Sequence, residues 1–446
     1  MTSFNKYVEP PALLRYLIKW LPLAMLVGAL AGSASALFLF ALAWATATRL
    51  AHPWLLALLP LGGFAVGWLY LRFGSAVEAG NNLLIDEIHD PKRVIPLRMA
   101  PLVLGGTVAS HLFGASVGRE GTAVQMGGAL ADQLTHVFRL RHEDRRTLLM
   151  AGISAGFASV FGTPLAGAVF GLEVLALGRL GANALLPCLV AAVAGDQVGL
   201  WWGVQHTHYA IGAVPPPALW TLAAVGVAGA AFGLAGRLFA QCTHALGAWV
   251  KHRVAYAPLR PLLGGIVVAA AGWSLGAERY LGLGIPTIQA AFQQPLPPWD
   301  WAGKLAFTVV SLGSGFKGGE VTPLFYVGAT LGNALAPLLQ LPFPLLAGVG
   351  FVAVFAGAAN TPIASTLMAV ELFGAEAGVY AGIACVLSYL FSGHTGIYRS
   401  QRLGRGKPGP RSRRAPAHLR LGELDAWRRS GDGRAAEPAS ETEQPR

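Results

Sequence analysis

One glycine-rich segment of the sequence has residue types that suit the binding of an anion. Gly118 and Gly121 flank Arg119 and Glu120, directly before an apolar stretch. Glycines at the start of a helix expose backbone N–H groups, and a helix N-terminus carries about half a positive charge. Such a terminus binds anions, and Glu120 occupies the position of the anion. Glu120 therefore either satisfies the dipole of its own helix or takes part in anion binding.

Two further glycine-rich segments and a tyrosine would add hydrogen-bond donors to such a site. One segment ends before Val321 and Thr322, which would present an N–H group and a hydroxyl to the same ligand. In the other, Gly80 precedes Asn81, whose amide is either a helix cap or a source of two more donors. Tyr398 ends the last apolar run and is either a donor or an interfacial aromatic residue.

The composition indicates that membrane-spanning helices position these residues. Of 446 residues, 54% are hydrophobic and 12% are charged, against about 25% charged in soluble domains. This composition excludes a soluble, disordered, coiled-coil or collagen-like chain. Two charge-free runs, Gln197–Gly236 and Val321–Val370, exceed the ~20 residues of one span, so each must contain two or more segments. An ionisable residue at membrane depth costs about 2.5–3.5 kcal/mol, which favours a functional role for Glu120.

An internal repeat shows how these segments are arranged. The pattern Phe-Ala-x4-Thr-Pro-x-Ala-x6-Glu occurs at Phe157–Glu173 and again at Phe355–Glu371, with a constant offset of 198 residues. Two halves built around glycine-broken segments are typical of a transporter whose site lies at the repeat interface. Glu173 and Glu371, which end the two copies, are interpreted as helix caps or interhelical pairs rather than proton carriers.

Three other functions are less consistent with the residues. Ser392 and His394 are close in sequence, but no nucleophile motif accompanies them, so we do not expect an enzyme. His206 and His208 have no cluster of carboxylates or cysteines nearby, so neither a metal nor a cofactor is expected. The tail, residues 399–446, supplies +6 of the net charge of +11, and we interpret it as a topology determinant rather than a nucleic-acid-binding segment.

The expected organisation has four parts. Residues 1–20 form a cytoplasmic N-terminal segment, and residues 21–200 and 201–398 form the first and second transmembrane repeats. Residues 399–446 form a disordered, basic cytoplasmic tail. Because basic residues at both ends favour the cytoplasmic side, we expect both termini there and a multi-pass protein of the inner (plasma) membrane, surrounded by lipid.

The motifs resemble those of the CLC family of anion channels and anion/proton antiporters. The resemblance rests on GREG at residues 118–121, FGTPLAGAVFGLE at residues 161–173 and a GxxxP segment at residues 319–323. It implies an all-α integral membrane protein with two inverted-topology repeats of tilted and broken helices, and a homodimer with one pore per subunit. It also implies that Glu120 gates the anion path and carries the proton, and that the hydroxyl of Tyr398 binds the central anion.

Four departures from the usual CLC pattern resemble the fluoride/proton antiporter branch. Asn81 replaces the central serine, Thr122 replaces the proline of GREGP, and Thr322 lies at the central site. Val174 occupies the position where many chloride/proton antiporters keep an internal proton-relay glutamate. Some relatives in this branch have phenylalanine at the position of Tyr326.

The sequence therefore predicts a membrane antiporter that exports fluoride in exchange for protons. An Asn amide, two hydroxyls and backbone N–H groups suit a small, strongly hydrated anion, although a larger halide can use the same donors. The alternative is an antiporter of chloride, another halide or nitrate, or a passive anion channel, on the same fold. The residues expected to bind the anion, besides Glu120 as the coupling residue, are Gly80, Asn81, Gly118, Arg119, Gly121, Val321, Thr322, Tyr326 and Tyr398.

Overall fold

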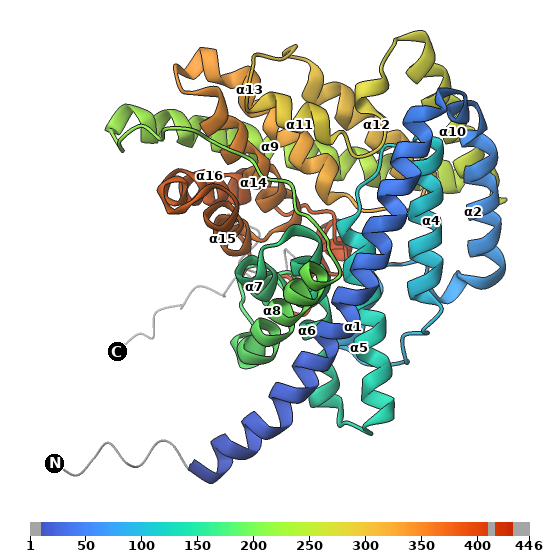
Figure 1. The fold of residues 1–446 in the computed structure, drawn as a ribbon, viewed down its shortest axis with the longest axis vertical. Helices are drawn as coiled ribbons and strands as arrows, with labels where there is room; N and C mark the ends of the chain where they lie inside the picture. Colours follow the sequence, from blue (N-terminus) through green and yellow to red (C-terminus); the bar gives the residue numbers. More distant parts are fainter. Residues whose placement is uncertain (1–9, 409–414, 431–446) are drawn as a thin grey trace, which may run out of the picture.

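The protein is built from helices that occur in the same order in both halves of the chain. The computed structural model describes residues 10–408 and 415–430, and in these residues every extended regular element is helical (Figure 1). The first half contains α1 (Pro10–Ala51), α2 (Leu59–Phe73), α3 (Asn81–His89), α4 (Met99–Phe113), α5 (Glu120–Val137), α6 (His142–Phe161), α7 (Pro164–Glu173) and α8 (Leu185–Trp201). The second half contains α9 (Leu219–Arg253), α10 (Leu259–Ser274), α11 (Ile285–Ala291), α12 (Asp300–Ser314), α13 (Val321–Leu339), α14 (Phe343–Ala359), α15 (Pro362–Phe373) and α16 (Gly378–Phe391).

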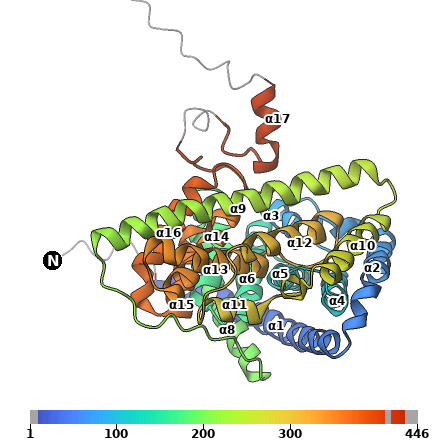
Figure 2. The same ribbon diagram turned by 90° about the horizontal axis from the view of Figure 1, so that it is seen from above.

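Within residues 10–408 and 415–430, five helical stretches are long and apolar enough to cross a membrane by length and composition. One of them is α9, which Figure 2 shows at full length along one face. The two long charge-free runs divide as expected. Gln197–Gly236 contains the end of α8, a connection and the start of α9, and Val321–Val370 contains α13, α14 and most of α15. The chain is an integral membrane protein with an all-α fold.

The two halves meet through equivalent glycines. Helices α4 and α12 are both 15 residues long and end at Gly114 (φ 95°) and Gly315 (φ 105°), in the left-handed conformation that glycine adopts at helix ends. Gly118 and Gly319 then exchange two N–H···O bonds, at 2.6 and 2.8 Å, in an antiparallel bridge. A residue that meets its own counterpart is expected where two copies are related by a two-fold axis. The starts of α5 and α13 are 201 residues apart, three more than the offset of 198 residues between the two Thr-Pro motifs.

The Thr-Pro motif breaks a helix in both halves. Helix α6 ends at Gly162 (φ 71°) and α7 begins at Pro164; α14 ends at Asn360 (φ 59°) and α15 begins at Pro362. Proline suits the first helical position because its missing N–H would have no partner there. The sequence thus produces two short helices, α7 and α15, at the interface between the halves.

Each short helix is capped by a carboxylate from the other half. Glu371 accepts hydrogen bonds from the N–H groups of Leu165 and Ala166 at the start of α7, both at 2.8 Å. Glu173 accepts from the two equivalent N–H groups of α15, at 3.0 and 2.8 Å. These bonds satisfy N–H groups that have no partner within their own helix. The interpretation of both glutamates as caps is confirmed.

The structure differs from the disorder predicted for the tail. Residues 399–408 and 415–430 are ordered and include α17 (Leu424–Arg429), and the rest of the tail lies outside the described residues. Leu177, which follows α7, packs with Leu403, Leu421 and Leu424 in a small apolar cluster. The prediction of disorder rested on the charged average composition of the tail and gave no weight to these few leucines. They become buried because Leu177 and the end of α7 lie beside them.

At the other end of the chain, α1 begins at Pro10, earlier than the first predicted span at residue 21. The first turns of α1 carry basic residues, and Lys19 forms an ion pair with Asp144 at 2.6 Å. A helix can extend past the apolar boundary when its charged side chains find partners there. Part of the predicted N-terminal segment is therefore helical, and residues 1–9 lie outside the described residues.

Candidate functional site

The carboxylate of Glu120 lies on the N-terminus of α13, a helix of the other half. The backbone N–H of Thr322 donates to Oε2 at 3.0 Å, and the Thr322 hydroxyl donates to Oε1 at 2.5 Å. The N–H of Arg119 also donates to Oε2, at 3.2 Å. Only 1% of Glu120 is exposed. The carboxylate thus accepts from the Thr322 hydroxyl, which the sequence assigned to an anion, but the N–H group that binds it belongs to Thr322 itself and not to Val321 as predicted.

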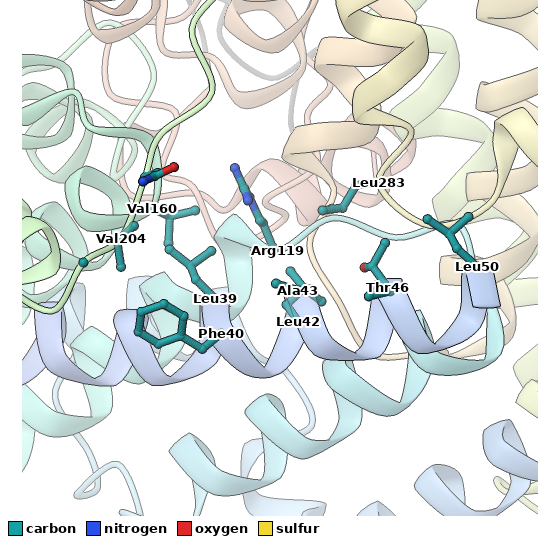
Figure 3. A pocket seen from close by; sticks show the side chains of 13 residues that line it. Leu39, Phe40, Leu42, Ala43, Thr46, Leu50, Arg119, Val160, Val204 and Leu283 are labelled. Atoms are coloured by element: carbon teal, nitrogen blue, oxygen red, sulfur yellow. The ribbon is translucent and has the colours of Figure 1, made fainter. Parts of the chain in front are cut away.

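Arg119 lies between Glu120 and an open cavity. Its Nε is 3.4 Å from Oε1 of Glu120, and 19% of its side chain is exposed. The cavity has a volume of about 570 Å³ and is bounded by α1, by the start of α5 and by the connections that contain Val204 and Leu283 (Figure 3). Arg119 gives this mostly apolar cavity a positive charge.

A second, much smaller cavity lies next to Glu120 itself. Its volume is about 20 Å³, which is enough for about one water-sized particle. Arg119 and Val160 line both cavities, so the two cavities are neighbours with these side chains between them. The remaining lining residues are Glu120, Phe161, Thr207, Tyr209, Ile285, Ile288, Thr322, Phe325, Phe351 and Leu372.

Asn81 lies beside the start of α5. It is the first residue of α3 after Gly80 (φ 57°), and its side chain makes no capping bond, so the helix-cap alternative does not hold. Its Nδ2 is so close to Gly121 that a Cβ at that position would be only 3.0 Å away. Its Oδ1 is buried and has no hydrogen-bond partner within the described residues. Glycine at position 121 thus allows the amide to approach the N-terminus of α5.

The two tyrosines expected in the site differ in position. Tyr398 is 3% exposed and close enough to Glu120 and Glu320 to interact electrostatically with both carboxylates. Neither Tyr398 nor Tyr326, which lies one turn after Thr322 on α13, lines the small cavity. The surroundings of Tyr326 differ from those of Tyr398. The ring of Tyr326 packs on Gly284, and the ammonium group of Lys304 lies 5.3 Å from the ring centroid. The structure therefore brings Tyr398, but not Tyr326, to the carboxylates.

Sequence reasoning missed the residues that enclose the small cavity. Thr207 and Tyr209 come from the connection between α8 and α9, and no motif marks them. Phe161 and Phe325, at the end of α6 and the start of α13, have ring centroids 5.2 Å apart. The edge of an aromatic ring carries a partial positive charge, which suits a neighbouring anion. Apolar residues in long apolar runs give no signal that distinguishes a cavity lining from a core.

Comparison with known proteins identifies related transport proteins. The sequence model of the family described as "Voltage gated chloride channel" matches residues 62–393. The chain is 66% identical over 430 residues to the "Chloride/fluoride channel protein" of Pseudomonas syringae pv. tomato, covering 95% of this chain and 94% of that one. It is 28% identical to the "H(+)/Cl(-) exchange transporter ClcA" of Vibrio vulnificus, covering 78% and 81%.

A solved structure extends this similarity to three dimensions. The crystal structure of a CLC-type fluoride/proton antiporter has a TM-score of 0.84 and 36% sequence identity with this protein. The match covers 86% of this chain and 98% of that chain. The arrangement of broken helices described above is therefore similar to that of a known antiporter over nearly its whole length.

Proposed function

Since the chain belongs to the voltage gated chloride channel (CLC) family, we propose that it exports fluoride across the membrane in exchange for protons. The family consists of transporters and channels, and the chain is not an enzyme. The observation that carries the proposal is the carboxylate of Glu120 on the N-terminus of α13, bonded to the N–H and hydroxyl of Thr322. An anion bound at this terminus would need the same donors.

The exchange follows from competition for one position. While Glu120 is ionised, it occupies the donors of Thr322 and excludes the anion. A proton neutralises the carboxylate, which then accepts hydrogen bonds less strongly and leaves these donors to the anion. The anion in turn leaves when the carboxylate loses its proton and returns. Because the two ions alternate at one place, they move in opposite directions across the membrane.

Fluoride, rather than chloride, is favoured by the donors of the site and by the similarity to a fluoride/proton antiporter. A small, strongly hydrated ion requires several donors in place of its water, and Asn81, Thr322 and Tyr398 would provide an amide and two hydroxyls. The similar solved structure is that of a fluoride/proton antiporter. The name of the Pseudomonas relative includes both anions, so exchange or channel conduction of chloride is the second candidate.

The remaining parts of the proposal concern the cell. We place the protein in the inner (plasma) membrane with both termini in the cytoplasm, because basic residues lie at the start of α1 and throughout the described part of the tail. We also propose that it forms a homodimer with one pore per subunit, as the family resemblance implies. Export of fluoride would protect the cell from it.

The direct test is reconstitution of the purified protein into liposomes, with a fluoride electrode and a pH probe in the same chamber. A fluoride gradient is expected to drive protons uphill in the opposite direction, and a chloride gradient to drive far fewer. Fluoride movement without proton movement would indicate a channel, and equal coupling to chloride would indicate the second candidate. Either result contradicts the proposal.

A further inference from the structure

The segment that follows Tyr398 is bonded to the helix that begins with Asn81. We name residues 399–403 the inner strap. Within it, the N–H of Ser400 donates to Oδ1 of Asn82, and the Ser400 hydroxyl donates to Oδ2 of Asp86, both at 2.9 Å. Asn82 and Asp86 belong to α3, whose first residue is Asn81. The inner strap therefore links two residues of the proposed anion site through a few short bonds.

The inner strap is also fixed to both halves of the protein by Gln401. This residue is fully buried, and its amide nitrogen donates to the carbonyl oxygens of Val174, at 2.9 Å, and Ala359, at 2.8 Å. Its amide oxygen accepts from the side chain of Asn360 at 3.0 Å. Since every polar atom of this amide is bonded between α7 and α14, the inner strap has one defined position.

The tail holds the outer side of the inner strap. We name residues 417–424 the tail clasp. The N–H of Leu421 donates to the carbonyl of Gln401 at 2.8 Å, and the N–H of Leu403 donates to the carbonyl of Leu419 at 3.0 Å. Beyond this backbone pairing, Nη2 of Arg420 lies 3.1 Å from Oδ1 of Asp86. The tail clasp thus reaches past the inner strap to the same carboxylate of α3 that Ser400 binds.

We propose that the tail clasp sets the distance between Asn81 and Tyr398, and that Arg420 is a positioning residue for the selection between anions. The inference rests on the proposed function, since it assigns a role to residues that do not contact the anion. Donors select between ions of different size only while their separation is fixed, and a supporting shell provides that rigidity. The ion pair between Arg420 and Asp86 joins α3 to the tail clasp, and the tail clasp is bonded in turn to the inner strap.

The energetics favour an effect on selectivity over an effect on folding. The side chains of Arg420 and Asp86 are 34% and 28% exposed. An ion pair at a partly exposed position contributes only a small part of the stability of a protein, since water and salt screen it. Loss of the pair should therefore leave the fold intact and release the end of α3.

The test compares Arg420→Gln with Arg428→Gln, a matched control on α17 that pairs only with Asp425, at 3.4 Å, among the contacts of the described residues. In liposomes, Arg420→Gln should lower the ratio of fluoride to chloride transport about twofold to fivefold, the range for a partly exposed ion pair. Ser400→Ala, which removes the other bond to Asp86, should lower it in the same direction. Arg428→Gln should match the wild-type protein, and Arg420→Lys, which keeps the charge, should restore most of the ratio.

The outcomes separate the two proposals. An unchanged ratio in both Arg420→Gln and Ser400→Ala, with the proteins folded, overturns the role of the tail clasp and leaves the proposed function intact. An equal loss of fluoride and chloride transport, at constant ratio, identifies a merely structural role and also overturns it. Failure of the wild-type protein to exchange fluoride for protons appears in the same assay before any variant is measured, and it contradicts the proposed function itself.

Discussion

Among the described residues, Glu120, Glu173 and Glu371 each accept hydrogen bonds from a helix N-terminus of the opposite half, but only Glu173 and Glu371 do so reciprocally. Glu173 and Glu371 form a reciprocal pair, because each accepts two N–H bonds from the start of the short helix that contains the other. Glu120 accepts from the start of α13, whereas Glu320, directly before α13, has its Oε2 only 3.6 Å from the position that a Cβ of Gly121 in α5 would take, yet it accepts no hydrogen bond from α5 in the part of the chain that the structure describes. The two glutamates at the site therefore form no reciprocal pair of hydrogen bonds like that of the caps.

The difference separates a structural carboxylate from an exchangeable one. If Glu173 or Glu371 left its position, two N–H groups at the start of a short helix would lose their hydrogen-bond acceptor, and we see no other group of the described residues that would take its place. Glu120 instead borders a cavity of about 20 Å³, and Arg119 lines both this cavity and a larger one of about 570 Å³. We expect an anion in this region to take over the hydrogen bonds of Glu120, so that the same interaction is broken and remade during transport.

The largest effect is expected from Glu120→Gln, which removes the charge from the exchangeable carboxylate. Proton movement coupled to fluoride should fall by at least about hundredfold, as for loss of a proton-transfer group. Fluoride should still pass through the protein, because the donors of Thr322 remain. Simultaneous fluoride and pH recordings in liposomes test this. If the variant still pumps protons against a fluoride gradient, Glu120 is not the exchangeable carboxylate.

Removal of a reciprocal cap should lower the stability of the protein and leave the coupling of protons to fluoride unchanged, in contrast to Glu120→Gln. Glu371→Ala leaves the N–H groups of Leu165 and Ala166 without a partner, and for Ala166, which is buried, the cost is about 1–3 kcal/mol. The temperature of unfolding in detergent should fall, while the ratio of protons to fluoride in the surviving protein stays at the wild-type value. A changed ratio with unchanged stability would mean that Glu371, like Glu120, takes part in coupling.

A smaller effect is expected from Thr322→Val, which removes the hydroxyl but keeps the N–H group. The fluoride concentration that gives half-maximal transport should rise about tenfold, since a hydrogen bond to a charged group contributes about 1.5–3 kcal/mol. Thr330→Val is the matched control, because the Thr330 hydroxyl bonds the carbonyl of Tyr326 on the same helix. Equal effects of the two substitutions would show that the hydroxyl of Thr322 acts only within its helix.

The smallest effect is expected from Asn81→Ser, which exchanges an amide for a hydroxyl beside Gly121. Because a serine side chain is shorter, the site should widen and the discrimination against chloride should weaken severalfold. Flux of each halide, measured at one pH in parallel liposomes, gives the ratio. If the ratio is unchanged, the amide of Asn81 does not contribute to selection.

The sequence predicts the fold and the polar half of the site because those features leave local signals. The Thr-Pro breaks, the repeated glutamates and the glycines before α5 and α13 are each recognisable within a few residues. The contact between Glu120 and Thr322 follows from them, since the repeat brings two helix starts together. The symmetry of the repeat also predicted a cap role for Glu173 and Glu371.

The rest of the site depends on contacts between distant parts of the chain. Phe161 and Phe325 resemble any other core residue until the halves pack together, and Tyr209 lies in a connection without a motif. The prediction for Tyr326 placed its ring in the site, but the helical turn after Thr322 directs it toward Gly284. The tail appeared disordered because its average composition is charged and polar.

The most direct test of the central claim is the dependence of fluoride binding on pH, measured by calorimetry with the wild-type protein and Glu120→Gln. If the carboxylate and the anion compete for the N-terminus of α13, the wild-type protein takes up about one proton for each fluoride bound, and its affinity weakens as the pH rises. The variant should bind fluoride with no proton uptake and with an affinity independent of pH. The same pH dependence in both proteins would contradict the account.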